Sequence, residues 1–165
     1  MKKIAKQGFT LTELMAVVII LAILMGIAAG GYRKATERSN FSEGLSMAHA
    51  IAEAVDRYHG QHPSVNQPEI DKLDIGITNK KACSDLSATA KLYCAQIAYF
   101  RIFVRTDGSV QAVRTNDKYT ITVYPESFGT HRYSKDTCAG KDGNTDFCVS
   151  VGYTSCTSGT CVKPD

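Results

Sequence analysis

The stretch that decides the fold is GFTLTELMAVVIILAILMGIAA, residues 8–29. From Leu14 to Leu24 it is apolar without a break, and only seven residues precede it. As a helix, Phe9 to Ala29 would extend about 31 Å, which is enough to cross the hydrocarbon core of a bilayer. The sequence therefore predicts a membrane-spanning helix at the start of the chain.

The carboxylate of Glu13 is out of place near the start of this apolar segment. An ionised side chain inside a membrane costs roughly 2 to 3 kcal/mol on insertion scales. Three ordinary interpretations leave it or its neighbours unexplained. A secretory signal peptide places no acid there, a simple membrane anchor gives no reason for Gly8-Phe9, and a buried helix of a soluble protein needs a larger core.

The string Gly8-Phe9-Thr10-Leu11-Thr12-Glu13-Leu14, after a leader that carries Lys2, Lys3 and Lys6, resembles the class III signal of type IV pilins and their pseudopilin relatives. The short leader and Phe9 resemble the type IVa subclass. The resemblance implies that prepilin peptidase cleaves between Gly8 and Phe9 and methylates the new N-terminus. It also implies assembly into a homopolymer of pilin subunits on an inner-membrane platform.

After such a cleavage, the Phe9 ammonium would be a fixed positive charge at the positive end of the helix dipole, where a carboxylate is favoured. In a filament the amine of another subunit can be the partner of Glu13. Opposite charges about 4 Å apart in a low-dielectric bundle attract by several kcal/mol, which offsets much of their desolvation. We expect Glu13 and Phe9 to act in assembly; the alternative is that Glu13 merely lies at the lipid headgroups.

Cysteine content sets the orientation of the chain, and charge excludes one function. The three leader lysines account for the net charge of +3, so the rest of the chain is balanced and gives no electrostatic case for nucleic-acid binding. Six cysteines in the C-terminal region indicate a disulfide framework, which forms outside the cytoplasm. We therefore expect the N-terminus to face the cytoplasm from the inner membrane before assembly, and the assembled protein to be an extracellular pilus.

The disulfide connectivity is open, because six cysteines allow fifteen pairings. Sequential pairing is the prediction, and each short loop that it closes would contribute roughly 2 to 3 kcal/mol. A zinc site would need paired Cys-x-x-Cys spacing, which is missing, so no metal or cofactor is expected. The predicted pairs are Cys83 with Cys94, Cys138 with Cys148, and Cys156 with Cys161.

Apolar residues recur every three or four positions from Tyr32 to Tyr58, which extends the first helix as an amphipathic one to about Gly60. Glycines at 26, 30 and 31 predict a loosened backbone between Gly26 and Gly31. The expected segments are a leader at 1–8, an assembly half-helix at 9–31, an amphipathic half at 32–59, a connection at 60–96, an antiparallel meander at 97–125 and a disulfide-rich region at 126–165.

The meander is predicted from a strand at Ala95–Arg105, a two-residue turn at Asp107-Gly108, a return strand at Ser109–Thr115 and a third strand at Tyr119–Tyr124. A further strand is expected at Phe147–Val151. The fold class is therefore α+β: a long N-terminal helix packed against a small antiparallel sheet, with a disulfide-stapled C-terminal region. This agrees with the pilin fold that the resemblance implies.

The sequence contains no arrangement of a nucleophile and a base, so we expect a protein that is not an enzyme. No further cluster of metal ligands lies near His49, His59 and His62 in the sequence, so we assign them no metal site. Asp142, Asn144 and Asp146 occupy alternate positions, as calcium ligands do. The glycine and glutamate of a calcium-binding loop are missing there, so a polar turn is expected instead.

Three function classes stay open: a structural pilin for adhesion, twitching motility or DNA uptake; a pseudopilin of a type II secretion system, which would be periplasmic; and a membrane-anchored binding module that does not polymerise. The external ligand is unknown, and Asn40-Phe41-Ser42 is a glycosylation sequon only where a suitable transferase exists.

Overall fold

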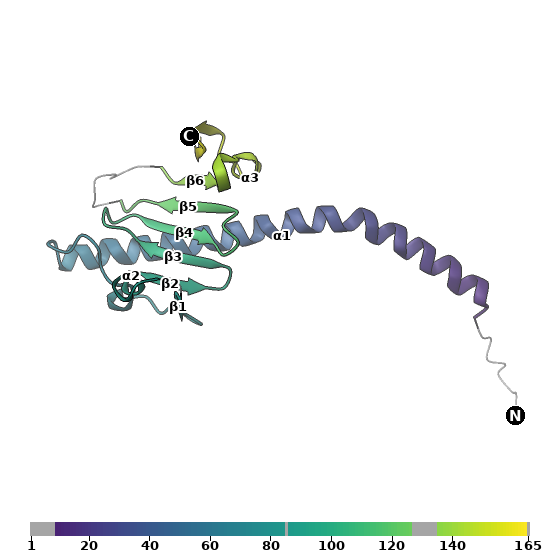
Figure 1. The fold of residues 1–165 in the computed structure, drawn as a ribbon, viewed down its shortest axis with the longest axis horizontal. Helices are drawn as coiled ribbons and strands as arrows, with labels where there is room; N and C mark the ends of the chain where they lie inside the picture. Colours follow the sequence, from purple (N-terminus) through teal and green to yellow (C-terminus); the bar gives the residue numbers. More distant parts are fainter. Residues whose placement is uncertain (1–8, 85, 127–134, 165) are drawn as a thin grey trace, which may run out of the picture. The chain divides into compact units, whose positions relative to one another are not determined.

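The computed structural model describes residues 9–84, 86–126 and 135–164 (Figure 1). Gly8 and the rest of the expected leader lie outside the described residues. The chain divides into two compact units, Met1–Ser39 and Asn40–Asp165, which are described separately below. Helix α1 (Leu11–Gln61) contributes residues to both.

In the first unit, α1 is helical through all three of the clustered glycines. Among the described residues, no single helix passes as a membrane span. The stretches Leu11–Ile27 and Gly30–Gln61, which meet at a bend of 44°, do pass together on length and composition. The bend falls within the predicted Gly26 to Gly31 region, while the looser amides expected there stay a prediction.

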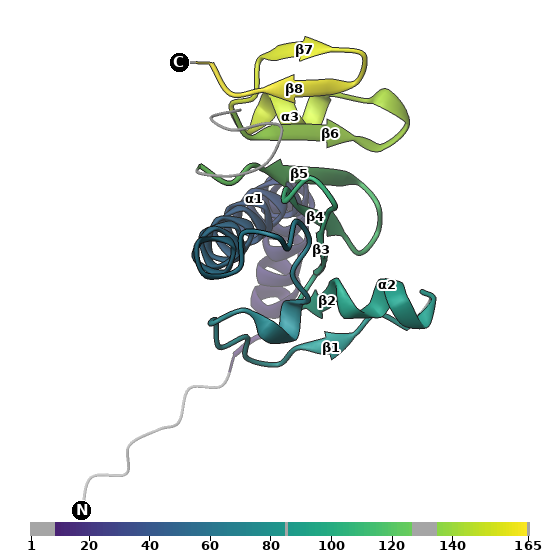
Figure 2. The ribbon, with the colours of Figure 1, turned by 90° about the vertical axis from the view of Figure 1, so that its left-hand side faces the viewer.

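The second unit is an eight-stranded antiparallel sheet with the C-terminal half of α1 on one face (Figures 1 and 2). The strand order is β1-β2-β3-β4-β5-β6-β8-β7. The strands are β1 (Lys81–Ala82), β2 (Cys94–Ile97), β3 (Phe100–Val104), β4 (Val110–Arg114), β5 (Tyr119–Val123), β6 (Thr137–Gly140), β7 (Ser155–Thr157) and β8 (Thr160–Val162). The short helices are η1 (Ile70–Lys72), α2 (Ala88–Leu92), η2 (Lys141–Gly143) and α3 (Asp146–Ser150).

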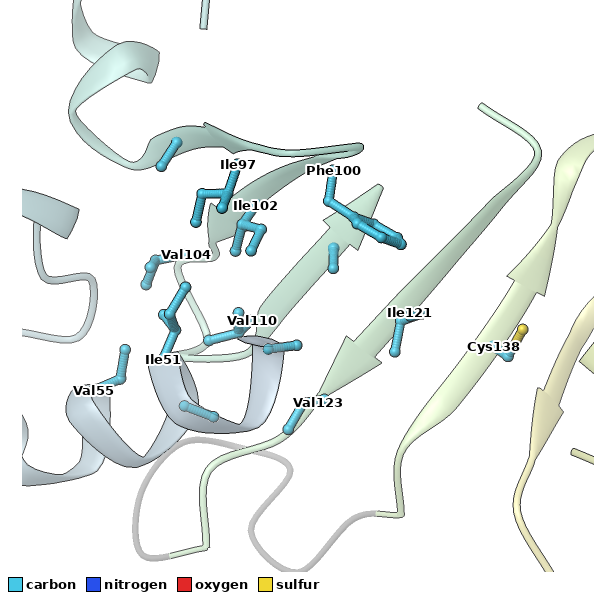
Figure 3. Close-up of a cluster of buried hydrophobic side chains, with 14 of the residues drawn as sticks. Ile51, Val55, Ile97, Phe100, Ile102, Val104, Val110, Ile121, Val123 and Cys138 are labelled. Atoms are coloured by element: carbon cyan, nitrogen blue, oxygen red, sulfur yellow. The ribbon is translucent and has the colours of Figure 1, made fainter. Parts of the chain in front are cut away.

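The core lies between α1 and the inner face of the sheet (Figure 3). Strands β3, β4 and β5 alternate buried and half-buried residues, as expected for a sheet with one covered face. The helix contributes buried side chains from Phe41 to Val55, so the predicted amphipathic half is confirmed there. Tyr32 is 74% exposed, because it precedes the part of α1 that meets the sheet.

The α+β fold and the strands at 110–114 and 119–123 are confirmed, but the single strand predicted at Ala95–Arg105 is wrong. It is a hairpin of β2 and β3, in which Ile97 pairs with Phe100 across a turn at Ala98 and Tyr99. Ala98 has a φ of 46°, which the sequence gives no reason to expect because alanine disfavours it.

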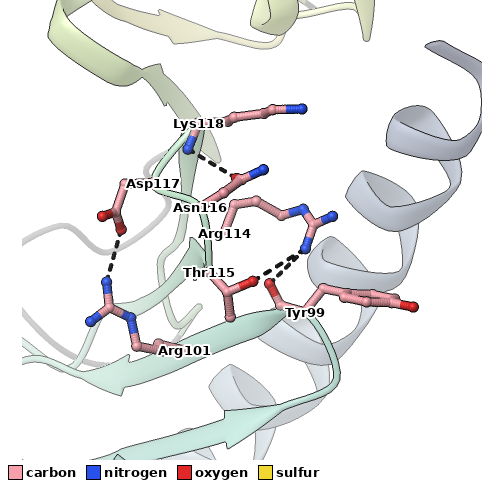
Figure 4. A network of polar contacts seen from close by, with 7 residues as sticks. All are labelled: Tyr99, Arg101, Arg114, Thr115, Asn116, Asp117 and Lys118. Carbon is pink, nitrogen blue, oxygen red and sulfur yellow. Dashed lines mark hydrogen bonds and ion pairs between the residues drawn. The ribbon is translucent and has the colours of Figure 1, made fainter. Parts of the chain in front are cut away.

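Contacts from the neighbouring strand hold this turn (Figure 4). The carbonyl oxygen of Tyr99 accepts hydrogen bonds from the Thr115 N–H, at 2.9 Å, and from the Arg114 guanidinium, at 3.0 Å. The same guanidinium lies 4.8 Å from the centre of the Tyr99 ring. Interactions across the sheet therefore fix a turn that lacks glycine, asparagine and aspartate.

Two further expectations need correction. The Asp107-Gly108 turn is where it was predicted, with Gly108 at a φ of 81°, but the connection from Val104 to Val110 is longer than a two-residue turn. The strand predicted at Phe147–Val151 is the helix α3. There the Phe147 ring stacks on Tyr119 with centroids 4.3 Å apart, so tertiary packing decides the conformation of an apolar segment too short to show a period.

The structure pairs the cysteines in sequence order. Cys83 is bonded to Cys94 around α2, Cys138 on β6 is bonded to Cys148 on α3, and Cys156 on β7 is bonded to Cys161 on β8. The second bridge ties α3 to the sheet, and the third joins the last two strands at its edge.

Candidate functional site

The start of α1 is a capping box built from Thr10 and Glu13. The Glu13 carboxylate oxygen Oε2 accepts hydrogen bonds from the Thr10 N–H, at 2.9 Å, and from its hydroxyl, at 2.7 Å. In return, the Glu13 N–H donates to Thr10 Oγ1 at 3.3 Å. The two residues thus satisfy donors that a helix N-terminus leaves without partners.

This arrangement explains why the helix begins at Leu11 rather than at Phe9, because Thr10 acts as the N-cap. The spacing Thr-x-x-Glu before an apolar run is visible in the sequence and could have predicted the cap. Only a role for the charge of Glu13 was predicted from the sequence. The structure gives the carboxylate a local role as well, and it holds one of its two oxygens at the positive end of the helix dipole.

The helix that follows exposes an all-round apolar surface. Its large apolar side chains from Leu11 to Ile27 are 48% to 76% exposed, and Phe9, just before the helix, is 84% exposed. A contiguous apolar surface of this size is typical of a site that contacts lipid or another protein. The exposed residues are Phe9, Leu11, Leu14, Met15, Val17, Val18, Ile19, Ile20, Leu21, Ile23, Leu24, Met25 and Ile27.

The predicted site residues thus fall into separate groups. Phe9 and Glu13 lie together at the start of α1, Gly8 is outside the described residues, and the six cysteines lie in the second unit. The side chain of Asn40 in the sequon is buried, with the residue only 9% exposed, which leaves its amide little room for a glycan.

One polar contact was missed by the sequence reasoning. His49 Nε2 on α1 lies 2.8 Å from Asp136 Oδ2, just before β6. Burial raises the pKa of the Asp136 carboxyl above its usual value, and the nearby His49 only partly offsets that effect. No local pattern links residues so far apart in the sequence, so only the fold could reveal the pair.

Within the described ranges, no group of three or more histidine, cysteine, aspartate or glutamate residues is arranged to hold a metal ion. In the turn at Asp142 to Asp146, the Asn144 Oδ1 accepts the Asp146 N–H at 2.9 Å. That amide oxygen is therefore engaged in a polar turn.

A family model and several curated proteins match parts of this chain. The family described as the prokaryotic N-terminal methylation motif matches residues 4–29, which include Gly8, Phe9 and Glu13. A fimbrial protein of Neisseria meningitidis serogroup A / serotype 4A is 41% identical over 64 residues, which cover 37% of this chain and 38% of that protein.

Two other relatives give the same picture. The type IV major pilin protein PilE1 of Neisseria gonorrhoeae is 39% identical over 64 residues, 37% of this chain and 39% of the pilin. The fimbrial protein EcpC of Eikenella corrodens is 41% identical over 59 residues, 36% and 39% of the two chains. The chain thus spans less than two fifths of the length of the curated relatives it matches, and no solved structure matches it. This chain therefore carries a match to the N-terminal methylation motif and is similar over part of its length to fimbrial proteins and type IV major pilins.

Proposed function

We propose that the protein is a structural, non-enzymatic subunit of a bacterial type IV pilus. The observation that carries the proposal is the exposed apolar helix that starts with the Thr10–Glu13 capping box, inside the segment that matches the methylation motif. A surface that is apolar on all sides suits two successive environments, the lipid bilayer before assembly and a bundle of like helices afterwards.

In this proposal prepilin peptidase cleaves between Gly8 and Phe9 and methylates the Phe9 amine. The subunit waits in the inner membrane with its N-terminus toward the cytoplasm, and the assembly platform adds it to an extracellular filament. The relatives named fimbrial protein and major pilin favour a pilus over a type II secretion pseudopilin.

Glu13 would then have two tasks in succession. In the free subunit its Oε2 atom caps α1 through Thr10. During assembly its negative charge would pair with the Phe9 amine of a neighbouring subunit, because the low dielectric of the bundle strengthens the attraction. A carboxylate has two oxygens, so capping through Oε2 leaves the other oxygen for an intersubunit contact.

Three substitutions separate these tasks. Glu13→Gln retains an oxygen that can accept the Thr10 hydrogen bonds but removes the charge. Glu13→Val removes both, whereas Thr10→Val keeps the charge and removes the hydroxyl of the cap. Each variant is expressed in a pilus-forming host. Filament yield is the amount of the protein in filaments sheared from the cells, divided by its total amount.

We expect Glu13→Gln and Glu13→Val each to lower filament yield at least about tenfold, the effect of losing roughly 1.4 kcal/mol per subunit addition. Thr10→Val should stay close to the unmodified protein. A Glu13→Gln variant that forms filaments normally would show that the carboxylate only caps the helix. Mass spectrometry of the N-terminus tests the processing step. We expect a chain that begins at Phe9 and carries one methyl group on its amine.

A further inference from the structure

Four of the six cysteines lie in or beside one row that crosses three adjacent strands. Cys138 on β6 is directly opposite Cys161 on β8, and Cys161 is directly opposite Cys156 on β7. The fourth, Cys148 on α3, is bonded to Cys138. Figure 2 shows β6, β8 and β7 side by side, with α3 next to β6. Cys161 therefore has a cysteine opposite it on both sides, and it is bonded to only one of them.

The unused neighbours, Cys138 and Cys161, satisfy the spacing that a disulfide needs. Directly opposed residues of antiparallel strands have Cα atoms about 4.5 to 5.5 Å apart and side chains on the same face. Disulfides usually join residues with Cα atoms about 4.4 to 6.8 Å apart. The register of β6 and β8 alone thus makes a Cys138–Cys161 bridge possible without a change of strand pairing.

Solvent reaches this row of cysteines at one end. Cys156 is exposed, and it lies in the three-residue edge strand β7, whose residues are all exposed. Cys138, Cys148 and Cys161 are each 0% exposed. A thiol in solution can therefore attack the Cys156 sulfur, while the Cys138–Cys148 bridge is shielded from direct attack.

We propose that the Cys138–Cys148 and Cys156–Cys161 bridges form one thiol–disulfide exchange unit, which an external thiol enters at Cys156. In the first step the external thiolate bonds to the Cys156 sulfur, the Cys156–Cys161 bond breaks, and Cys161 leaves as a thiolate. In the second step Cys161 bonds to the Cys138 sulfur, the Cys138–Cys148 bond breaks, and the Cys148 thiolate takes a proton from water. The external thiol, of the small-molecule or dithiol reductase class, is the only co-reactant.

The consequence for the fold is local. The exchange replaces the disulfide between α3 and β6 with a disulfide between β6 and β8. The sheet therefore keeps one covalent cross-link, and α3 loses its only disulfide. With its covalent link gone, the five-residue helix depends on packing such as the stack of Phe147 on Tyr119. The unit is thus a redox-sensitive switch that releases α3 and β7 from their disulfides and joins β6 to β8.

The test starts with the purified full chain in detergent. The protein is exposed to a limiting amount of reduced glutathione, quenched with an alkylating agent, digested and mapped by mass spectrometry. We expect a peptide pair linked through Cys138 and Cys161, together with an alkylated Cys148. An alkylated Cys161 together with a Cys156 that is bonded to glutathione or alkylated, and with Cys138–Cys148 intact, would overturn the proposal.

Two matched variants make the test independent of the reductant. Cys156→Ser leaves Cys161 as a thiol directly opposite Cys138, whereas Cys161→Ser leaves Cys156 as a thiol one strand further away. We expect alkylated Cys148 to be at least tenfold more abundant in the first variant than in the second. Equal and low Cys148 alkylation in both would reject the exchange, and if either variant misfolds, the glutathione experiment on the unmodified chain decides alone.

Discussion

The ring of Phe100 on β3 occupies the space that a side chain at Gly44 on α1 would need. A Cβ atom at Gly44 would lie 2.5 Å from Phe100 Cζ, closer than real Cβ contacts come. Phe100 is 0% exposed, so its ring has no route into solvent. Glycine costs an α-helix about 1 kcal/mol relative to alanine, and here that cost permits the helix and the sheet to pack closely.

Gly44→Ala should therefore destabilise the protein by about 1 to 3 kcal/mol, as overpacking of a tight core does. Urea unfolding of the full chain in detergent, followed by circular dichroism, measures the change. Gly60→Ala is the matched control, because nothing lies within 4 Å of a Cβ at that helical position. It should be neutral or stabilising, and equal losses in both variants would contradict the packing argument.

Tyr153 supplies a test of pH dependence. Burial, helped by the negative Asp136, raises the pKa of its hydroxyl to about 12. Because the folded-state pKa is above the usual value near 10, this group contributes stability that is complete below pH 10 and is lost as the pH rises toward 12. In the described part of the chain the hydroxyl has no hydrogen-bond partner.

Tyr153→Phe should therefore cost less than about 1 kcal/mol at pH 7, and it should reduce the loss of stability between pH 10 and pH 12. Tyr153→Ala should cost about 3 to 5 kcal/mol, because it removes a ring that packs edge-on against Phe41 with centroids 5.7 Å apart. Urea unfolding at each pH gives the free energies. An identical alkaline loss in the Phe variant would assign that loss to another group.

Much of the fold follows from local patterns in the sequence. The alternation from Tyr119 to Val123 and the helical period that buries Ile51 and Val55 both predicted the correct element and face. These patterns work because one face of each element meets the core. The hydrophobic segment at the N-terminus was visible in the sequence because its apolar run is long and unbroken. Glu13 was visible because its charge lies next to that run.

The errors arise where distant residues decide local conformation. The turn at Ala98 is fixed by Thr115 and Arg114 from the next strand, and nothing in the dipeptide Ala98-Tyr99 indicates it. Segment 147–151 is rich in apolar residues, but a disulfide to β6 and a ring stack hold it as a helix. The His49–Asp136 contact joins positions far apart in the chain, so a sequence pattern has no access to it.

The clustered glycines predict local mobility within α1. A Cβ at Gly26, Gly30 or Gly31 would meet nothing within 4 Å, so tertiary packing within the described residues does not account for these glycines. We expect hydrogen exchange of amides 26 to 31 in detergent to be faster than in residues 14 to 24. Replacing all three glycines with alanine should slow it by roughly a hundredfold, because each alanine stabilises a helix by about 1 kcal/mol. Full protection of these amides in the unmodified protein would contradict the prediction.

The turn at Ala98 yields a substitution that should stabilise the protein. Ala98 is exposed and has a φ of 46°, a left-handed conformation that costs an alanine roughly 1 kcal/mol and a glycine almost nothing. Ala98→Gly loses no buried contact, so relief of this strain should outweigh the greater freedom of glycine in the unfolded chain and raise the free energy of unfolding by about 0.5 kcal/mol. The control is Ala139→Gly in the interior of β6, where the backbone is extended and glycine should lower stability by about 0.5 to 1 kcal/mol. Urea unfolding distinguishes the two signs, and a loss of stability in both variants would mean that the β2–β3 hairpin does not hold Ala98 in the left-handed region.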